Sequence, residues 1–473
     1  MQKYDFDEVI PRRGSGCVKW DEAPSEMVNG QWSMVNDVIP LWVADMDFAV
    51  APAIQEAIRR RAEHPVFGYT HVGEEYYKAI ISWFHRRHQW EIRREEILYT
   101  TGVVPAMSVA IKALTMPGEK VLILSPDYNC FFSSTKNNGC EVLETELIRG
   151  SERGVKGSEG GVKGTLHFEV DWRDFEACCA DEKTTVFLLC NPHNPTGRVW
   201  TAEELGRMND ICMRHGVRVV SDEIHCELIM PGHRFQPFAA VSEECRRNSV
   251  ILNSPSKSFN IAGLMTANII CADPAMRRRL NRAININEVC DLNPFGPVAL
   301  VAAYNESEDW IDQLNDYLWG NYQALCQFFA EHFPQCRVTQ LEGTYLVWVD
   351  VSALCLKSKV YGLKSEVHRL KSEVYGLKSE VHRLKSEVYG LKSKVYRLKS
   401  EVQSPKSEVQ VLNVQQLCDH IYREAHVWIN PGTMYGPQTG EGYVRINIAC
   451  PRQQLMEALR RLKASNVFTS PAS

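Results

Sequence analysis

The run Ser254-Pro255-Ser256-Lys257-Ser258-Phe259-Asn260 comes just after a short apolar stretch, Val250-Ile251-Leu252. An apolar stretch of this length is typical of a buried strand, so Ser254, Ser256 and Lys257 are expected to crowd around a strand end. Two hydroxyl groups and an amine at one point suit a ligand that carries a phosphate beside a carbonyl group. Because a lysine near a strand end is ordinarily a solvated surface charge, the interpretation depends on the rest of the chain.

A second candidate for phosphate binding lies upstream, in Ile97-Leu98-Tyr99-Thr100-Thr101-Gly102-Val103-Val104-Pro105. This stretch predicts a strand, a glycine turn and a helix over residues 106–114, with a proline near its first turn. Backbone N–H groups at the start of a helix lack partners within the helix, and the helix dipole favours an anion there. An ordinary strand-to-helix connection would have the same features.

Polar residues also end two further apolar stretches. Asn191-Pro192-His193-Asn194-Pro195-Thr196-Gly197-Arg198 follows residues 186–190, and its two prolines and glycine predict a rigid loop that aims the Asn194 amide at a ligand. A purely structural turn is the alternative. Asp222-Glu223-Ile224-His225 follows residues 217–221, where a buried carboxylate is unfavourable unless a cation pairs with it. A protonated ring nitrogen would serve as that cation.

Short apolar stretches alternate with longer amphipathic ones between residues 45 and 293, which is typical of a mostly parallel sheet with crossover helices. Residues 121–124, 186–190, 217–220 and 250–252 are the expected central strands. We therefore predict a large α/β domain over residues 48–295. Residues 296–473 are expected to form a smaller α+β domain, joined by the N-terminal segment 1–47. Its expected elements are a helical region within 310–333, a strand within 344–349 and a final helix over 453–463.

Two segments repeat with a period of seven residues. Residues 151–164 hold two copies of a glycine-rich unit, which predicts a flexible surface loop. Residues 357–410 repeat the unit Ser-Glu-Val-Tyr/His-Gly/Arg-Leu-Lys, so valines and leucines alternate at spacings of three and four. This stripe predicts either a coiled-coil arm or a duplicated tract tolerated in an exposed loop. The glycines within it (Gly362, Gly376, Gly390) disfavour a helix and therefore favour the second interpretation.

Charge and composition exclude several classes of function. The formal net charge of -5 over 473 residues provides no basic field that would attract nucleic acid. The 16 cysteines are scattered without a C-x-x-C pair or a zinc-site spacing, so we expect reduced thiols in the cytoplasm and no metal site. Residues 1–10 lack the apolar segment of a signal peptide, and no stretch predicts a membrane span.

Taken together, the four polar stretches resemble the fold-type I enzymes that depend on pyridoxal 5'-phosphate (PLP), because the motifs occur in that family's order. The resemblance implies the aspartate aminotransferase fold, with a large PLP-binding domain and a smaller α+β domain. It implies that Lys257 forms the Schiff base with PLP, that Asp222 pairs with the pyridine nitrogen and that Asn194 bonds the phenolic oxygen. The phosphate would be held by Ser254, Ser256 and the backbone amides of Val103 and Val104.

Two further residues match positions that the family uses. Tyr128, in Ser125-Pro126-Asp127-Tyr128, matches the aromatic residue that stacks on the cofactor ring, although an aromatic residue after a strand can equally be part of a core. Arg445, in Tyr443-Val444-Arg445-Ile446-Asn447, matches the arginine that binds the substrate's α-carboxylate with its planar fork of donors. An ion pair at a strand edge is the alternative for Arg445.

Within that family the sequence is similar to the MalY/PatB branch of carbon–sulfur β-lyases. The shared signature comprises Pro40-Leu41-Trp42-Val43-Ala44-Asp45-Met46-Asp47-Phe48, Phe67-Gly68-Tyr69 and Ser221-Asp222-Glu223-Ile224-His225. His225 stands where many related aminotransferases have a tyrosine, and Met265 stands where they often have a phosphate-binding Arg or Lys. Both departures favour a lyase. The resemblance also implies that Tyr69 reaches the PLP phosphate of a neighbouring subunit, so we expect a homodimer with shared active sites.

The implied activity is cleavage of cystathionine or of cysteine S-conjugates to a thiol, pyruvate and ammonia. Lys257, once free, would act as the base at the substrate's Cα. The first alternative is a PLP-dependent aminotransferase. The second is a regulatory binding protein that uses the same fold, or the heptad segment, to hold a partner.

Overall fold

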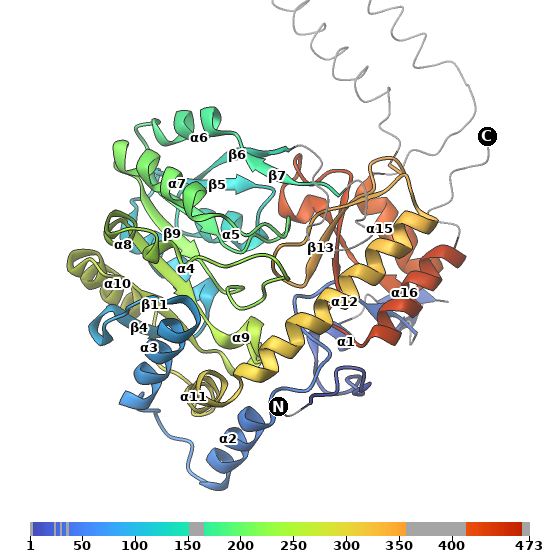
Figure 1. The fold of residues 1–473 in the computed structure, drawn as a ribbon, viewed down its shortest axis with the longest axis horizontal. Coiled ribbons are helices and arrows are strands. Elements are labelled where there is room, and N and C mark those ends of the chain that lie inside the picture. The colour runs from blue at the N-terminus through green and yellow to red at the C-terminus, as the bar shows by residue number, and fades with distance from the viewer. Residues whose placement is uncertain are drawn as a thin grey trace, which may run out of the picture.

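The computed structural model describes residues 3–22, 25–28, 31–34, 37–150, 165–355 and 413–465, and Figure 1 shows their arrangement. Both repeat segments, 151–164 and 357–410, lie outside the described residues. The predictions of a surface loop and of a coiled-coil arm or tolerated tract therefore stay predictions.

An eight-stranded sheet forms the centre of the larger part of the molecule (Figure 1). The strands β10, β9, β8, β5 and β6 run parallel, whereas β11 pairs antiparallel with β10 and β4, and β7 with β6. The order across the sheet is β4 (Ile97–Thr100), β11 (Ala267–Ile270), β10 (Ser249–Asn253), β9 (Arg218–Asp222), β8 (Thr184–Cys190), β5 (Lys120–Ser125), β6 (Glu141–Arg149), β7 (Phe168–Val170). The predicted α/β fold with a mostly parallel sheet is confirmed.

Helices cover both faces of this sheet, which explains the nearly continuous apolar character of its strands. In β5, Val121 and Ile123 point into one core and Leu122 and Leu124 into the other. The first core is closed by α4 (Val103–Leu114) and α10 (Pro274–Ile286); the second includes α6 (Trp172–Cys179), α7 (Ala202–Arg214) and α8 (Glu243–Asn248). In the lower part of Figure 1, α11 (Gly296–Glu306) packs against α2 (Pro52–Glu63) and α3 (Glu74–His88).

The register of the central strands brings the predicted polar stretches to one edge. Asp222, the last residue of β9, lies beside Cys190 of β8 and Leu252 of β10. The loop that carries Asn194 and the helix that carries Lys257 therefore begin at the same level as Asp222. This is the arrangement that parallel strands produce at their carboxyl ends.

A second sheet has four antiparallel strands in the order β12 (Arg337–Val338), β13 (Leu346–Asp350), β16 (Tyr443–Asn447), β15 (Asn430–Pro431). The helices α12 (Glu308–His332) and α15 (Val414–Ala425) pack against it, and α16 (Arg452–Ala464) packs against these two helices. The strand predicted within 344–349 begins at Leu346, because Thr344 has a left-handed backbone with a φ of 70°.

The N-terminal segment contacts this second sheet, because the Asn447 amide of β16 donates to the Leu41 carbonyl at 2.9 Å. The strand β3 (Ile39–Pro40) pairs with β14 (Val427–Trp428), and the rings of Trp42 and Trp428 stack 4.1 Å apart. Lys19 is fully buried, and its amine donates to the Asp47 carboxylate at 2.8 Å. The contacts with β14 and β16, unlike the Lys19–Asp47 pair within the segment itself, support our proposal that residues 1–47 join a small domain of residues 296–473, beside a large domain of residues 48–295.

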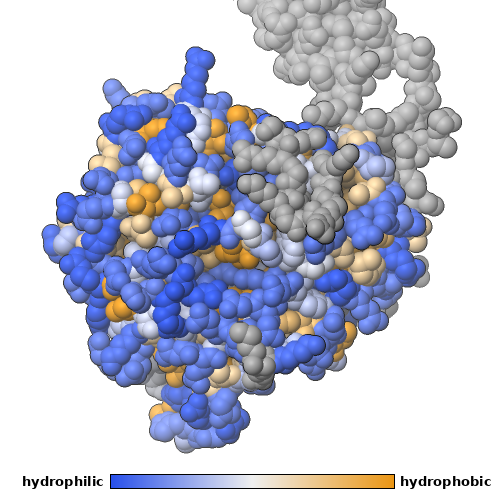
Figure 2. Space-filling model, viewed as in Figure 1, coloured by the Kyte–Doolittle hydropathy of each residue, from blue (hydrophilic) through white to orange (hydrophobic). Residues whose placement is uncertain are grey.

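The surface is largely polar on the face drawn in Figure 2, where hydrophilic side chains surround small, separate apolar groups. Among the helices in the described ranges, none is both long and apolar enough to cross a membrane.

Candidate active site

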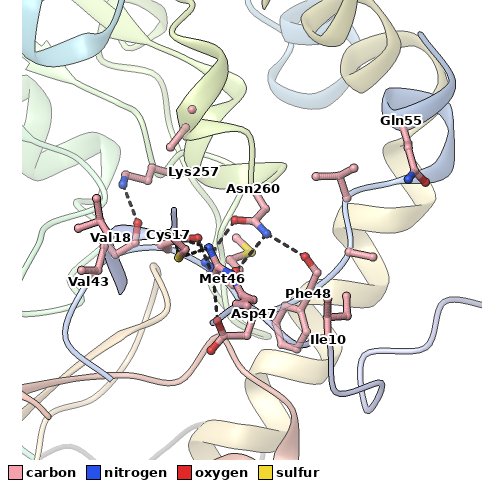
Figure 3. Close-up of a pocket in the computed structure, with 17 residues that line it drawn as sticks. Ile10, Cys17, Val18, Val43, Met46, Asp47, Phe48, Gln55, Lys257 and Asn260 are labelled. Carbon is pink, nitrogen blue, oxygen red and sulfur yellow. Dashed lines mark hydrogen bonds and ion pairs between the residues drawn. The ribbon is translucent and has the colours of Figure 1, made fainter. Parts of the chain in front are cut away.

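Lys257 lies on a short helix whose start is fixed by its own serine. The helix α9 (Pro255–Ser258) has Pro255 at its first position, and the Ser254 hydroxyl accepts a hydrogen bond from the Ser256 amide at 3.0 Å. The same hydroxyl donates to the Thr266 carbonyl at 2.7 Å. This cap directs Lys257 toward residues 43–45, where its amine donates to the Ala44 carbonyl at 2.6 Å (Figure 3).

A cavity of about 700 Å³ opens beside the Lys257 amine. Its walls come from the N-terminal segment, from residues 43–50 and from the turn after α9, which includes Asn260, Ala262 and Gly263. Burial lowers the pKa of Lys257, and the charges of Asp45 and Asp222 partly oppose this effect. The amine is therefore more easily deprotonated than a surface lysine, as a catalytic base requires.

Asp222 is buried at the end of β9 without an ion-pair partner among the described residues. Its carboxylate accepts one hydrogen bond, from the Ile224 amide at 3.1 Å. Burial raises the pKa of Asp222 to about 7, and the nearby Asp127 carboxylate acts in the same direction. A carboxylate in this state would gain from a cationic ligand placed beside it.

Arg445 of β16, in the second sheet, contacts Asn194 in the loop that follows β8 of the central sheet. Arg445 Nη1 donates to the Asn194 side-chain oxygen at 3.3 Å, and Nη2 donates to the Trp42 carbonyl at 2.6 Å. The guanidinium group lies 4.7 Å from the centre of the Tyr435 ring. Its Nε is buried without a hydrogen-bond partner, so one donor of the fork is available to a ligand.

His225 is a buried, uncharged imidazole in this site. Burial, followed by the positive charges of Lys257 and Arg445, lowers the pKa of His225 to about 3. Its Nδ1 is buried without a hydrogen-bond partner, and its ring meets the edge of Tyr345 at 5.9 Å. The side chain is thus available to a ligand as a neutral hydrogen-bonding group.

Tyr128 lies close enough to Asp222 and Arg445 for both charges to influence the pKa of its hydroxyl: Asp222 raises it and Arg445 lowers it. Burial is the main cause that raises the pKa of Tyr128. The helix α4, whose first turn is the predicted phosphate site, begins at Val103, three residues earlier than predicted, with Pro105 in its first turn. The N–H groups of Val103 and Val104 therefore belong to the first turn, where no carbonyl of the helix can accept them.

Tyr69, a further predicted site residue, lies at the surface of the single chain. It is 96% exposed and does not line the cavity beside Lys257. Met265 is also exposed, with a left-handed φ of 48°.

Several residues in the site were not predicted from the sequence. The negative charge of Asp45 raises the pKa of Lys257. Both Asp45 and Arg12, which comes from the N-terminal segment, line the cavity. Tyr435 lies under Arg445, and the Cys130 thiol interacts with the Tyr128 hydroxyl. Asp45 carries a signal that could have identified it, because it directly ends the apolar run Leu41-Trp42-Val43-Ala44. Arg12 carries none, since its position depends on contacts with distant residues.

Comparisons with known proteins agree with this geometry. The family model "Aminotransferase class I and II" matches residues 36–462. Cystathionine beta-lyase PatB of Bacillus subtilis is 32% identical over 98% of this chain and 99% of its own length. Protein MalY of Escherichia coli is 29% identical over 97% of this chain and 98% of its own.

Among solved structures, cystalysin of Treponema denticola, which contains a pyridoxal 5'-phosphate cofactor, superposes with a TM-score of 0.78 at 29% identity. The match covers 98% of this chain and 99% of cystalysin. The resemblance inferred from the motifs is thereby confirmed. The chain belongs to the class I and II aminotransferase family, in the branch that contains PatB and MalY.

Proposed function

We propose that the protein is a PLP-dependent carbon–sulfur β-lyase that cleaves cystathionine or cysteine S-conjugates to a thiol, pyruvate and ammonia. The observation that carries the proposal is the buried Asp222 carboxylate, without a cationic partner in the described ranges, in the same site as the Lys257 amine. The similarity to PatB, a cystathionine beta-lyase, and to the PLP-containing cystalysin supports the choice of reaction and cofactor.

The side chains present fit PLP. Lys257 would form the covalent bond to it, Asp222 would pair with its ring nitrogen, and Asn194 would donate to its phenolic oxygen. Tyr128 would cover the ring, His225 would contact it as a neutral group, and the phosphate would bind the first-turn amides of Val103 and Val104. Ser256 suits the phosphate better than Ser254, because the Ser254 hydroxyl hydrogen is already donated to Thr266.

When bound, PLP supplies an electron sink for negative charge at the substrate's Cα. Arg445 holds the α-carboxylate with its free Nε–H and with the Nη donors, which places Cα within reach of Lys257. The Lys257 amine removes the Cα proton, which its lowered pKa favours. Asp222 must be ionised in this state, and a cationic partner would lower its pKa to permit that.

The reaction balances without an added oxidant or reductant. The electron pair of the Cα–H bond forms a Cα–Cβ double bond, and the electron pair of the Cβ–S bond leaves with sulfur as a thiolate. The Lys257 ammonium can return its proton to that thiolate. One water then converts the released aminoacrylate into pyruvate and ammonia.

The test is a visible absorbance spectrum of the protein with PLP, for the wild type and for Lys257→Ala. We expect a bound-PLP band in the wild type that borohydride fixes covalently, and no fixation in the variant. A wild type that binds no PLP would refute the proposal. Aminotransferase activity, the main alternative, would instead require an added 2-oxo acid before any product forms.

We also propose that the protein is a homodimer and works in the cytoplasm. Tyr69, Phe67 and Val66 are large side chains that are 96%, 54% and 63% exposed, and burial against a second subunit would remove them from water. Each of the sixteen cysteines is a free thiol in the structure, which suits a reducing compartment.

A further inference from the structure

The cavity beside Lys257 extends away from the reacting amine, so that Lys257 and Gln55 lie at opposite ends of its lining residues (Figure 3). Most of the lining side chains are apolar, among them Ile10, Val18, Val43, Met46, Phe48 and Val50. Arg445, which we propose to bind the α-carboxylate, does not line this cavity. A substrate held between Arg445 and Lys257 therefore has this cavity for the group attached to its sulfur.

Arg12 is the lining cation other than Lys257 in the described part of the chain, but its terminal nitrogens are occupied. Nη1 donates to the Met46 carbonyl and to Asp47, each at 2.8 Å. Nη2 donates to Asp45 and to the Cys17 sulfur, each at 2.8 Å. A carboxylate entering the cavity would have to displace one of these acceptors to gain an ion pair with Arg12.

Asp45 is the lining carboxylate that remains accessible. Its side chain is 25% exposed, whereas that of Asp47 is 3% exposed and is held by Lys19 and Arg12. Asp45 also follows Ala44, whose carbonyl accepts the hydrogen bond from Lys257. Burial has the largest influence on the pKa of Lys257 and of Tyr345, and in both cases the negative charge of Asp45 comes next. The field of Asp45 therefore reaches the reacting amine although Arg12 is paired with it.

We propose that this cavity receives the sulfur substituent of the substrate and that Asp45 is a specificity-determining residue that rejects substituents with a net negative charge. The proposal rests on the proposed lyase function. Uncharged, cationic or zwitterionic substituents enter a mostly apolar cavity whose accessible carboxylate is Asp45, 25% exposed and paired with Arg12, which is 20% exposed. An anionic substituent meets the like charge of Asp45 in a low-dielectric site, where the terminal nitrogens of Arg12 already have acceptors.

The experiment compares three cysteine thioethers of similar length on the PLP-loaded wild type: S-propyl-, S-(2-aminoethyl)- and S-(2-carboxyethyl)-L-cysteine. Pyruvate release gives kcat/KM for each. We expect the carboxyethyl compound to be about tenfold or more slower than the propyl compound, because two like charges repel strongly in a poorly solvated cavity. The aminoethyl compound should be cleaved at least as fast as the propyl compound.

Variants then assign this selectivity to Asp45. Asp45→Asn keeps an acceptor for Arg12 but removes the charge, so the penalty for the carboxyethyl compound should fall below about threefold. Asp45→Glu keeps the charge and should keep the penalty. Asp210→Asn, the same change on an exposed position of α7, is the matched control and should leave all three rates unchanged.

Two results would overturn the inference: equal cleavage of the propyl and carboxyethyl compounds by the wild type, or an undiminished penalty in Asp45→Asn. If Asp45→Asn does not fold, the wild-type comparison and Asp45→Glu still decide. A protein that cleaves none of the three compounds contradicts the proposed lyase function instead, so the two failures are distinguishable.

Discussion

The carboxylate of Asp222 is held in a state that a folded protein ordinarily avoids. It is 4% exposed and accepts one backbone hydrogen bond. Among the described residues it forms no ion pair, and the pKa that burial and Asp127 raise is lowered only in part by the charge of Lys257. A strongly raised carboxylate pKa, in a site that also holds a buried lysine, is typical of functional residues. PLP would provide the missing positive charge, which is why the residue fits a cofactor site better than a structural one.

Without PLP, this residue should make stability depend on pH. Burial raises the pKa of Asp222 to about 7, so the folded protein keeps a proton that the unfolded chain releases near pH 4. Stability from this residue is therefore present at acidic pH and lost as pH rises toward 7. We expect Asp222→Asn to show a smaller loss of Tm between pH 5 and pH 8 than the wild type.

Burial also raises the pKa of Glu223 to about 8, so part of the decrease in stability with rising pH should remain in both the wild type and Asp222→Asn. Bound PLP should reduce the difference in the pH dependence of Tm between the wild type and Asp222→Asn, because the pyridine nitrogen would hold Asp222 in its ionised form. Equal pH dependence of wild-type and Asp222→Asn protein without PLP would show that Asp222 is ionised in the absence of a partner.

Single residues also show what the sequence could and could not predict about the site. Lys257, Asp222 and Asn194 were predictable because each follows a recognisable apolar strand, and parallel strands bring their carboxyl ends to one edge. Arg12 and Tyr435 were not, because nothing in their neighbouring sequence indicates a long-range contact. The Ser254 hydroxyl donates to the carbonyl of Thr266, twelve residues away along the chain, and no local sequence pattern encodes that contact.

At the scale of elements, the turn that follows β9 is anchored by Glu227, two residues beyond His225. Its carboxylate accepts hydrogen bonds from Trp83 at 2.8 Å and from Arg87 at 3.3 Å, and lies 2.6 Å from His88 Nε2, all on α3. Its carbonyl accepts from Asn315 of α12 at 2.7 Å. Although burial alone would raise the pKa of Glu227, His88 and Arg87 hold it at about 2.

Replacing this anchor should affect both stability and turnover. Glu227→Gln removes the buried carboxylate that His88 and Arg87 share, although Arg87 keeps Asp312 at 2.8 Å. Breaking a buried pair typically costs about 3–5 kcal/mol. We expect a loss of that order in urea unfolding, together with a lower kcat because His225 loses its fixed position.

Glu308→Gln is the matched control for this change. Glu308 bonds the same Arg87 at 3.4 Å but is 42% exposed, so its loss should cost less than about 1 kcal/mol. Similar losses of stability in the two variants would contradict the role of Glu227 as an anchor.

The elements themselves were largely predictable, and their boundaries less so. The central strands appeared where short apolar stretches end in polar residues, because burial on both faces requires such stretches. The helix α4 begins at Val103 rather than at residue 106, since a proline is tolerated in a first turn. The N-terminal segment was expected to join the smaller domain, but the pairing of β3 with β14 is a long-range contact that short local patterns do not encode.

For the whole molecule, the exposed Tyr69 is the feature that the single chain leaves unexplained. In a dimer with shared sites, Tyr69 would contact the phosphate of the PLP bound to the other subunit. Each site would then need Lys257 from one subunit and Tyr69 from the other. A mixture of two inactive variants can then restore activity.

We expect Lys257→Ala and Tyr69→Ala homodimers to be weakly active or inactive on a cysteine thioether. After co-expression, the mixed dimer would contain one site with both native residues, which predicts roughly a quarter of the wild-type activity in a statistical mixture. Separately purified variants, mixed without subunit exchange, are the control. Activity that never exceeds the sum of the two variants would contradict shared sites.

The most direct test of the lyase assignment is the product balance for S-propyl-L-cysteine, with PLP present and every 2-oxo acid left out. We expect propanethiol, pyruvate and ammonia in equal amounts over many turnovers, and none of them from Lys257→Ala. Turnover that begins only after a 2-oxo acid is added, with the amino group recovered on that acid, would contradict the lyase assignment.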